Sequence, residues 1–170
     1  FQRAIDTNPA YAEVYDNIGR LLEEMGQLED AIASYQQALS INPQLPSVHN
    51  NIGLVYKVLG QLDESVLSFR KAIDINPNYA GAHSNLGSVL ADQGEILPAF
   101  EVYKKALRLD PDLAEAYGNI GRLLLQIGQV DEAVKLYQQA CKLAPKSSAR
   151  SEEHTSELQS LVNLVCRLLL

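Results

Sequence analysis

The sequence has too few cysteines for a small disulfide-stapled secreted domain, and its apolar runs are too short for a membrane-spanning helix. Its 170 residues include two cysteines, Cys141 on an apolar stripe and Cys166 near the C-terminal end, and these make no disulfide framework of the kind that staples small secreted domains. This cysteine usage mildly favours a reducing compartment, so we expect a cytoplasmic location. No apolar run approaches the roughly 18 residues that a membrane-spanning helix needs, and we expect no membrane partner.

Positive charge is also scarce. The chain carries 14 Lys and Arg against 21 Asp and Glu, which gives a net charge of −7, and the cations are scattered along the sequence. Proteins that bind nucleic acid concentrate positive charge on one face. We therefore expect no nucleic-acid partner.

The usual catalytic arrangements are missing from the sequence as well. It shows no Ser-His-Asp or Cys-His arrangement, no glycine-rich phosphate loop and no metal-ligand spacing. We predict that these residues form no catalytic site, bind no cofactor and no metal, and are not by themselves an enzyme.

What the sequence does contain is a period of 34 residues. Five prolines share it: Pro9, Pro43, Pro77, Pro111 and Pro145. Two glycine registers follow the same spacing: Gly19, Gly53, Gly87 and Gly121, and then Gly26, Gly60, Gly94 and Gly128. Self-similarity at such a period is the signature of a repeat protein.

Each period predicts a first amphipathic helix. Ile18, Leu21, Leu22 and Met25 fall at i, i+3, i+4 and i+7, which is one stripe of an α-helix. Gly26 follows this stripe, and glycine is the residue that most easily takes the left-handed conformation just past a helix end.

A second helix follows in each period, with the stripe Ala31, Tyr35, Ala38 and Leu39. Gly19 and Ala31 carry little or no side chain, as expected where two antiparallel helices cross closely, because a bulkier residue there would overpack the crossing. A residue before proline is pushed out of the α region, so we expect the pairs to end at Asn42–Pro43, Asn76–Pro77, Asp110–Pro111 and Ala144–Pro145.

These residues resemble the tetratricopeptide repeat family. The resemblance rests on Tyr15, Ile18-Gly19, Ala31, Tyr35, Ala38, Pro43 and their equivalents in three further copies. It implies an all-α fold, a right-handed superhelical solenoid of antiparallel helix pairs whose first helices line a concave groove. It places full repeats at 12–45, 46–79, 80–113 and 114–147, after the end of a truncated repeat at 1–11. Phe1 has the register of Tyr35, so the chain is expected to start inside a second helix.

Residues 148–170 fall outside the period. Arg150 to Ser160 reads RSEEHTSELQS, which resembles an in-frame translation of a common short-read sequencing adapter, and 163–170 resembles its distal part. We expect a non-native tail without function. Its apolar residues do share one helical face, so it could still pack as an accidental helix on the last repeat.

A ladder of asparagines recurs just before the Ile-Gly or Leu-Gly pair: Asn17, Asn51, Asn85 and Asn119. In its repeated Asn-(Ile/Leu)-Gly the chain is similar to O-linked N-acetylglucosamine transferases, where such a ladder grips peptide backbone. An amide that donates and accepts can bracket a peptide bond. The alternative is that these side chains bond between neighbouring helices, as asparagine does at this register in tetratricopeptide repeats generally.

Other positions of the expected groove are mostly neutral or acidic: Glu13, Ser47, Gly81 and Glu115, and then Asp16, Asn50, Ser84 and Gly118. Positive charge on that face comes only from Arg20 and Arg122. The charge clamp that grips chaperone C-terminal tails needs paired Lys and Arg, so we do not expect it here.

His49 and His83 lie one period apart, which raises the possibility of a metal site. They have the register of Tyr15 and Tyr117, however, which is a packing position, and stacked helices lie too far apart for two imidazoles to share zinc readily. We interpret both as aromatic substitutions.

The sequence leaves three functional hypotheses. The first is a non-enzymatic module that binds an extended peptide or protein segment in the groove. The second is a substrate-recruiting arm of a larger enzyme such as a glycosyltransferase, whose catalytic domain lies outside this fragment. Self-association through exposed solenoid ends is the third.

Overall fold

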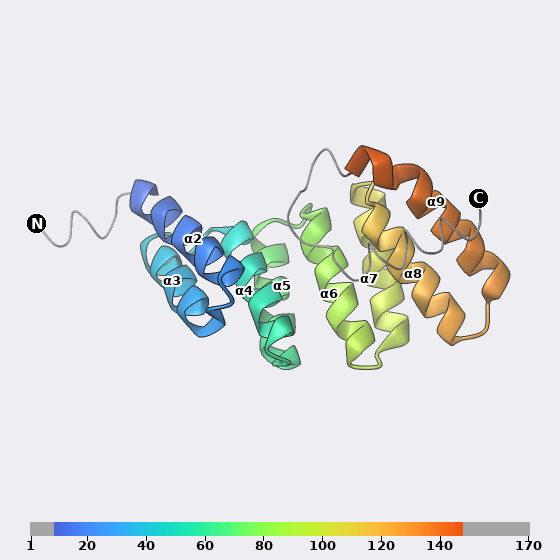
Figure 1. Ribbon diagram of the computed structural model, residues 1–170, viewed down its shortest axis with the longest axis horizontal. Coiled ribbons are helices and arrows are strands. Elements are labelled where there is room, and N and C mark those ends of the chain that lie inside the picture. The colour runs from blue at the N-terminus through green and yellow to red at the C-terminus, as the bar shows by residue number, and fades with distance from the viewer. Residues whose placement is uncertain (1–8, 148–170) are drawn as a thin grey trace, which may run out of the picture. The chain divides into compact units, whose positions relative to one another are not determined.

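The computed structural model describes residues 9–147, which form eight helices and no strand (Figure 1). The helices are α2 (Pro9–Glu24), α3 (Leu28–Ile41), α4 (Pro46–Val58), α5 (Leu62–Ile75), α6 (Ala80–Asp92), α7 (Ile96–Leu109), α8 (Ala114–Gln126) and α9 (Val130–Ser147). The proposed adapter-derived tail, with Cys166, lies outside the described residues, as does most of the truncated repeat expected at 1–11.

The helices pack as antiparallel pairs within two compact units, which divide inside α6 between Val89 and Leu90. In the first unit α2 packs on α3 and α4 on α5, and α3 also contacts α4. In the second unit α8 packs on α9, and α7 contacts α8. The predicted all-α architecture of helix pairs is confirmed.

Each first helix ends in the same way, at a glycine in the left-handed region. Gly26, Gly60, Gly94 and Gly128 have φ values of 74°, 73°, 81° and 79°. At the end of α2 the Gly26 amide donates to the Glu23 carbonyl at 2.9 Å, and the Gln27 amide donates to the Leu22 carbonyl at 2.8 Å. This Schellman arrangement satisfies carbonyls that the helix would leave unbonded. The predicted role of these glycines is confirmed.

In the first two pairs, α2–α3 and α4–α5, the first helix presents a glycine to an aromatic ring of the second. A Cβ atom on Gly53 would lie 2.7 Å from the Phe69 ring, and one on Gly19 would lie 2.5 Å from the Tyr35 ring. Both rings are fully buried, and the Tyr35 hydroxyl donates to a Glu23 carboxylate oxygen at 2.9 Å. The predicted need for a small residue at the crossing is confirmed, and the structure identifies the aromatic ring that imposes it.

The turns between pairs depend on the side chain that precedes the proline. The Asn42 Oδ1 accepts from the Gln44 amide at 3.0 Å, the Asn76 Oδ1 from the Asn78 amide at 3.1 Å, and the Asp110 Oδ1 from the Asp112 amide at 3.1 Å. These Asx turns hold the chain in a non-helical path after α3, α5 and α7.

The prediction that the last pair ends at Ala144–Pro145 is wrong, because α9 continues to Ser147. Alanine has no side-chain oxygen and cannot form an Asx turn. Proline alone disfavours a helix at the preceding residue without excluding it. The three earlier helices therefore owe their sharp ends to the Asn or Asp side chain as well as to the proline.

Two histidines also hold turns. The Nε2 atom of His49 lies 3.2 Å from the Pro43 carbonyl oxygen, and that of His83 lies 3.0 Å from the Pro77 carbonyl oxygen. A carbonyl only accepts, so each ring donates from Nε2. Each imidazole thus ties the start of a first helix to the turn before it. Among the described residues no group of three or more potential ligands could hold a metal.

Two further expectations concern location. None of the helices that the structure describes is long and apolar enough to cross a membrane. Cys141 takes part in a disulfide bond, and the cytoplasmic location stays a prediction.

The close approach at Gly53 predicts a large cost for one methyl group. We expect Gly53→Ala to lower the free energy of unfolding by about 1–3 kcal/mol, because the new Cβ would overlap the buried Phe69 ring. Urea denaturation followed by circular dichroism measures this. Gly81→Ala is the matched control, since its Cβ would lie 3.3 Å from the side chain of Tyr79 and helix propensity favours alanine. Equal stability of the two variants would contradict the overlap.

The environment of His49 predicts that the stability of the fold depends on pH. Burial lowers the pKa of its imidazole from 6.5, and the nearby charge of Lys71 lowers it further, against the hydrogen bond to Pro43. The unfolded chain therefore binds a proton more readily, and stability is lost as pH falls from about 6.5 through the lower folded pKa. We expect His49→Tyr, which restores the residue type of Tyr15, to flatten this loss in thermal melts recorded between about pH 8 and pH 5. Parallel curves for the two proteins would contradict the assignment.

Candidate functional site

The four ladder asparagines lie on the first helices but differ in exposure. Asn17 on α2 is exposed, Asn51 on α4 and Asn85 on α6 are half-buried, and Asn119 on α8 is fully buried. The first three belong to the first unit. We call the surface of α2, α4 and α6 that carries them, together with Asp16 and Asn50, the ladder face.

Two ladder amides are held by the preceding first helix. The Asn51 Nδ2 donates to the Asp16 Oδ1 at 3.3 Å, and the Asn85 Nδ2 donates to the Asn50 Oδ1 at 2.9 Å. The two residues of each bond are 35 positions apart in the sequence, so each bond joins one repeat to the next. Bonding between neighbouring helices, which was the alternative interpretation of the ladder, is therefore present at these two positions.

These bonds use only part of each amide. An asparagine offers two N–H donors and an oxygen with two lone pairs. Asn51 and Asn85 each spend one N–H on the neighbouring helix, and within residues 9–147 the oxygen of each accepts no hydrogen bond. Because both side chains are half-exposed, one donor and one acceptor per residue are still able to bond to a ligand.

Asp16 is the ionisable member of the ladder face. Burial raises the pKa of its carboxyl above 3.8, although the hydrogen bond from Asn51 and the charge of Arg20 pull it down. Arg20 is exposed one turn further along α2. Tyr79 is also affected, since burial raises the pKa of its phenol and the charge of Asp16 adds to the rise.

The remaining predicted site residues are less accessible. Asn50 and Ser84 are buried, and the Ser84 Oγ has no hydrogen-bond partner among the described residues. In the second unit, neither amide atom of Asn119 is bonded to any described residue, and neither is the buried Nε of the half-buried Arg122. The part of the ladder open to a ligand is therefore Asn17, Asn51 and Asn85.

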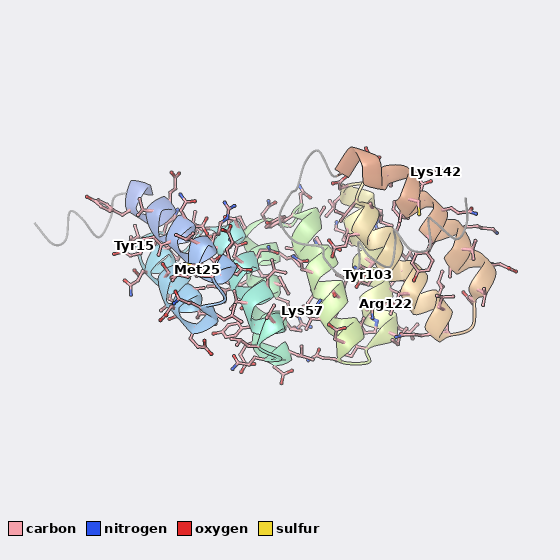
Figure 2. The ribbon with its side chains drawn as sticks, viewed as in Figure 1. Tyr15, Met25, Lys57, Tyr103, Arg122 and Lys142 are labelled. Carbon is pink, nitrogen blue, oxygen red and sulfur yellow. The ribbon has the colours of Figure 1, made fainter. Side chains whose placement is uncertain are left out.

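One cation near the ladder face is not among the residues predicted for the site. Lys57 on α4 donates from Nζ to the Ser88 Oγ on α6 at 2.6 Å (Figure 2). Ser88 has the register of Arg20 and Arg122, so Lys57 brings positive charge to a position that the sequence assigned to a neutral residue. The sequence offers one indication of this contact, which is the length of the lysine side chain. It is long enough to reach from α4 to a residue on the next first helix.

An apolar cleft lies apart from the ladder, in the second unit. It has a volume of about 460 Å³ between α7, α8 and α9, and its apolar walls include Phe100, Leu107, Leu124 and Leu136. Leu124 has the register of Tyr56 in the second repeat.

The half-buried Asp16 carboxyl predicts that its charge lowers the free energy of unfolding. Because its folded pKa lies above that of the unfolded chain, ionisation costs stability at neutral pH. We expect Asp16→Asn, which keeps an oxygen acceptor for Asn51 as Asn50 does for Asn85, to raise the free energy of unfolding at pH 7. The gain should shrink toward pH 4, as urea titrations at several pH values would reveal.

The converse substitution is the control. Asn50→Asp places a carboxylate in a more buried site and should lower stability at pH 7. A gain for Asn50→Asp, or no change for Asp16→Asn, would contradict the account of the Asp16 environment.

The fold is shared with several solved structures. A crystal structure of MamA is similar over 87% of this chain and 86% of that chain, with 25% sequence identity and a TM-score of 0.72. The structure of the first TPR of Spaghetti (RPAP3) bound to the HSP90 peptide SRMEEVD matches 73% of this chain and 98% of that chain, with 21% identity and a TM-score of 0.69. PilF of Pseudomonas aeruginosa matches 79% of this chain and 61% of that chain, at 21% identity and a TM-score of 0.73.

Sequence profiles give the family. No curated protein sequence matches the chain. Profiles described as TPR repeat match residues 19–60 and 58–94, and profiles described as tetratricopeptide repeat match residues 1–33 and 78–146. Together with the helix pairs, the glycine crossings and the 34-residue period, these matches show that the chain belongs to the tetratricopeptide repeat family.

Proposed function

We propose that the chain is a protein-interaction module that binds an extended segment of a partner protein along the ladder face of α2, α4 and α6. The observation that carries this proposal is the half-used amide of Asn51 and of Asn85. Each is anchored to the neighbouring helix by one N–H and keeps an unbonded oxygen and a second N–H at a half-exposed position.

An extended peptide offers the complementary groups at regular intervals. Its backbone presents N–H and C=O groups that are not bonded to each other, and an asparagine side chain can donate to one and accept from another. Anchoring by Asp16 and Asn50 fixes the orientation of the amides before a ligand arrives, which lowers the entropy that binding would otherwise cost. Regular spacing of the amides along a face thus favours recognition of backbone over recognition of one side chain.

The charges of the ladder face set the class of ligand. Glu13, Asp16 and Glu24 lie on or beside it on α2, against the cations Arg20 and Lys57. Such a mixed surface does not form the cluster of cations that binds a strongly acidic segment. We propose that the ligand is an uncharged or mixed-charge segment, not an acidic C-terminal tail.

The peptide-bound neighbour supports the general mode of binding. The first TPR of Spaghetti (RPAP3) holds an HSP90 peptide. It has the same fold as 73% of the present chain. We propose that this chain also holds a peptide, and that the differing charge of its ladder face selects a different sequence.

A second candidate function is a substrate-recruiting arm of a larger enzyme such as a glycosyltransferase. The repeated Asn-(Ile/Leu)-Gly favours it, because a ladder that grips backbone can deliver many different side chains to a catalytic domain. The intact gene sequence of the parent protein tests this candidate, and a domain with a nucleotide-sugar site would support it.

The ladder is tested by peptide selection followed by substitution. A library of random peptides displayed on phage is panned against the full chain, and enriched peptides are synthesised and titrated. We expect the double variant Asn51→Ala/Asn85→Ala to weaken binding by roughly tenfold or more, since each amide contributes about 0.5–1.5 kcal/mol per hydrogen bond. Methylation of the peptide backbone nitrogens should weaken binding to the wild type in the same way.

Matched control variants remove exposed amides away from the ladder face. Gln36→Ala on α3 and Asn78→Ala in the turn before α6 should leave the affinity unchanged. Unchanged affinity of the double variant for every selected peptide would reject the ladder, and failure to enrich any peptide would reject peptide binding.

A further inference from the structure

The ladder asparagines stand on neighbouring first helices, and this sets the distance from one amide to the next. Asn85 on α6 bonds directly to Asn50 on α4 at 2.9 Å. Asn51 on α4 bonds directly to Asp16 on α2 at 3.3 Å. Such short side chains meet only between helices that pack side by side, and the axes of packed helices lie about 8–10 Å apart. Because Asn51 and Asn85 share one register, their amides are also about 8–10 Å apart.

An extended ligand can use successive amides only if its own backbone repeats at this distance. A β-strand turns equivalent groups to one side at every second residue, so they recur at about 6.7 Å and then at about 13 Å. A polyproline II helix has three residues per turn and rises about 3.1 Å per residue, so equivalent groups recur at about 9.3 Å. Of these two extended conformations, polyproline II is the one that matches the ladder.

An aromatic ring lies beside the ladder face at the start of α6. The side chain of Tyr79 is half-buried, and a Cβ atom on Gly81, a residue of the expected groove, would lie 3.3 Å from its ring. Burial raises the pKa of the Tyr79 phenol and the charge of Asp16 adds to the rise, so the phenol is also close enough to feel the ladder carboxylate. Grooves that hold polyproline II segments are lined with aromatic side chains. The ladder face therefore offers a surface for proline as well as partners for the backbone.

We propose that the segment bound on the ladder face is a polyproline II helix, in which Asn51 and Asn85 bond to residues three positions apart. This inference rests on the proposed peptide-binding function and names the conformation of its ligand. Each amide keeps one N–H for a backbone C=O and its oxygen for a backbone N–H of the residue that faces it. A polyproline II helix has no internal hydrogen bonds, so its backbone groups are open to the amides.

The proposal determines where proline stands in the ligand. Proline has no backbone N–H, so it is excluded from the two residues that face the amides. At the two residues between them proline is allowed, because its fixed φ suits polyproline II. Proline there also orders the segment before binding, which lowers the entropy that binding costs. The ligand is therefore an uncharged or mixed-charge segment with proline between the facing residues.

Two phage-displayed libraries of equal peptide length test the three-residue step against the full chain. Four repeats of Xaa-Xaa-Pro leave pairs of residues three apart that both keep an N–H. Six repeats of Xaa-Pro put a proline at one of any two residues three apart, although they favour polyproline II equally. We expect the first library to enrich binders and the second to enrich none. Enrichment from the second library as strong as from the first would overturn the proposal.

An N-methyl scan of an enriched synthetic peptide then locates the facing residues. We expect a loss of about threefold to tenfold in affinity at two positions three residues apart, and smaller changes between them. Asn51→Ala should remove the effect of methylation at one of the two positions, and Asn85→Ala at the other, because the bond is already lost. Sensitive positions two or four residues apart would overturn the polyproline II conformation while peptide binding to the ladder stands. Loss of the proposed function itself would show differently, as peptides that bind without needing either amide.

The role of the aromatic ring has its own variants. Tyr79→Leu restores the residue type of Leu45 and Leu113, which share its register, so we expect the fold to be kept. It should weaken binding of peptides from the Xaa-Xaa-Pro library severalfold, because leucine offers no ring for proline. Tyr79→Phe is the matched control and should bind as the wild type does. Equal affinity of Tyr79→Leu and Tyr79→Phe would overturn the contact between the ring and proline.

Discussion

The close crossing of the two helices in the α2–α3 and α4–α5 pairs is the constraint on which the first unit depends. The missing side chain of Gly19 and Gly53 lets the ring of Tyr35 or Phe69 reach the backbone of the first helix. That ring is the largest fully buried side chain of its pair, so the crossing supplies much of the apolar burial that each pair gains. The left-handed glycine after the first helix and the Asx turn after the second then determine where each pair begins and ends.

Stacking of the pairs leaves the first helices joined by polar contacts. Asn51 reaches Asp16, Asn85 reaches Asn50 and Lys57 reaches Ser88, so neighbouring first helices of the first unit are bonded through side chains on one face. A surface held in this way is ordered before any ligand binds. The proposed peptide-binding function uses the hydrogen-bonding capacity that these contacts leave over.

How far the site could be predicted differs from residue to residue. The register of Asn17, Asn51, Asn85 and Asn119 is identical in the sequence, yet their exposures run from open to fully buried. Local spacing cannot give this difference, because the exposure of a side chain on a first helix is set by what packs on that helix. Lys57 was not predicted for a related reason. Its long side chain donates a hydrogen bond to Ser88, which belongs to the next repeat.

By itself the sequence determined the all-α class, the helix pairs, the left-handed glycines and the small residue at each crossing, because all of these depend on residues close together in one period. Only the tertiary structure decided that the ladder amides bond to the preceding helix, that α9 runs past Pro145 and that Cys141 is disulfide-bonded. Those features depend on atoms that lie far apart along the chain or on the absence of one side-chain oxygen, and a repeating pattern of residue types does not specify either.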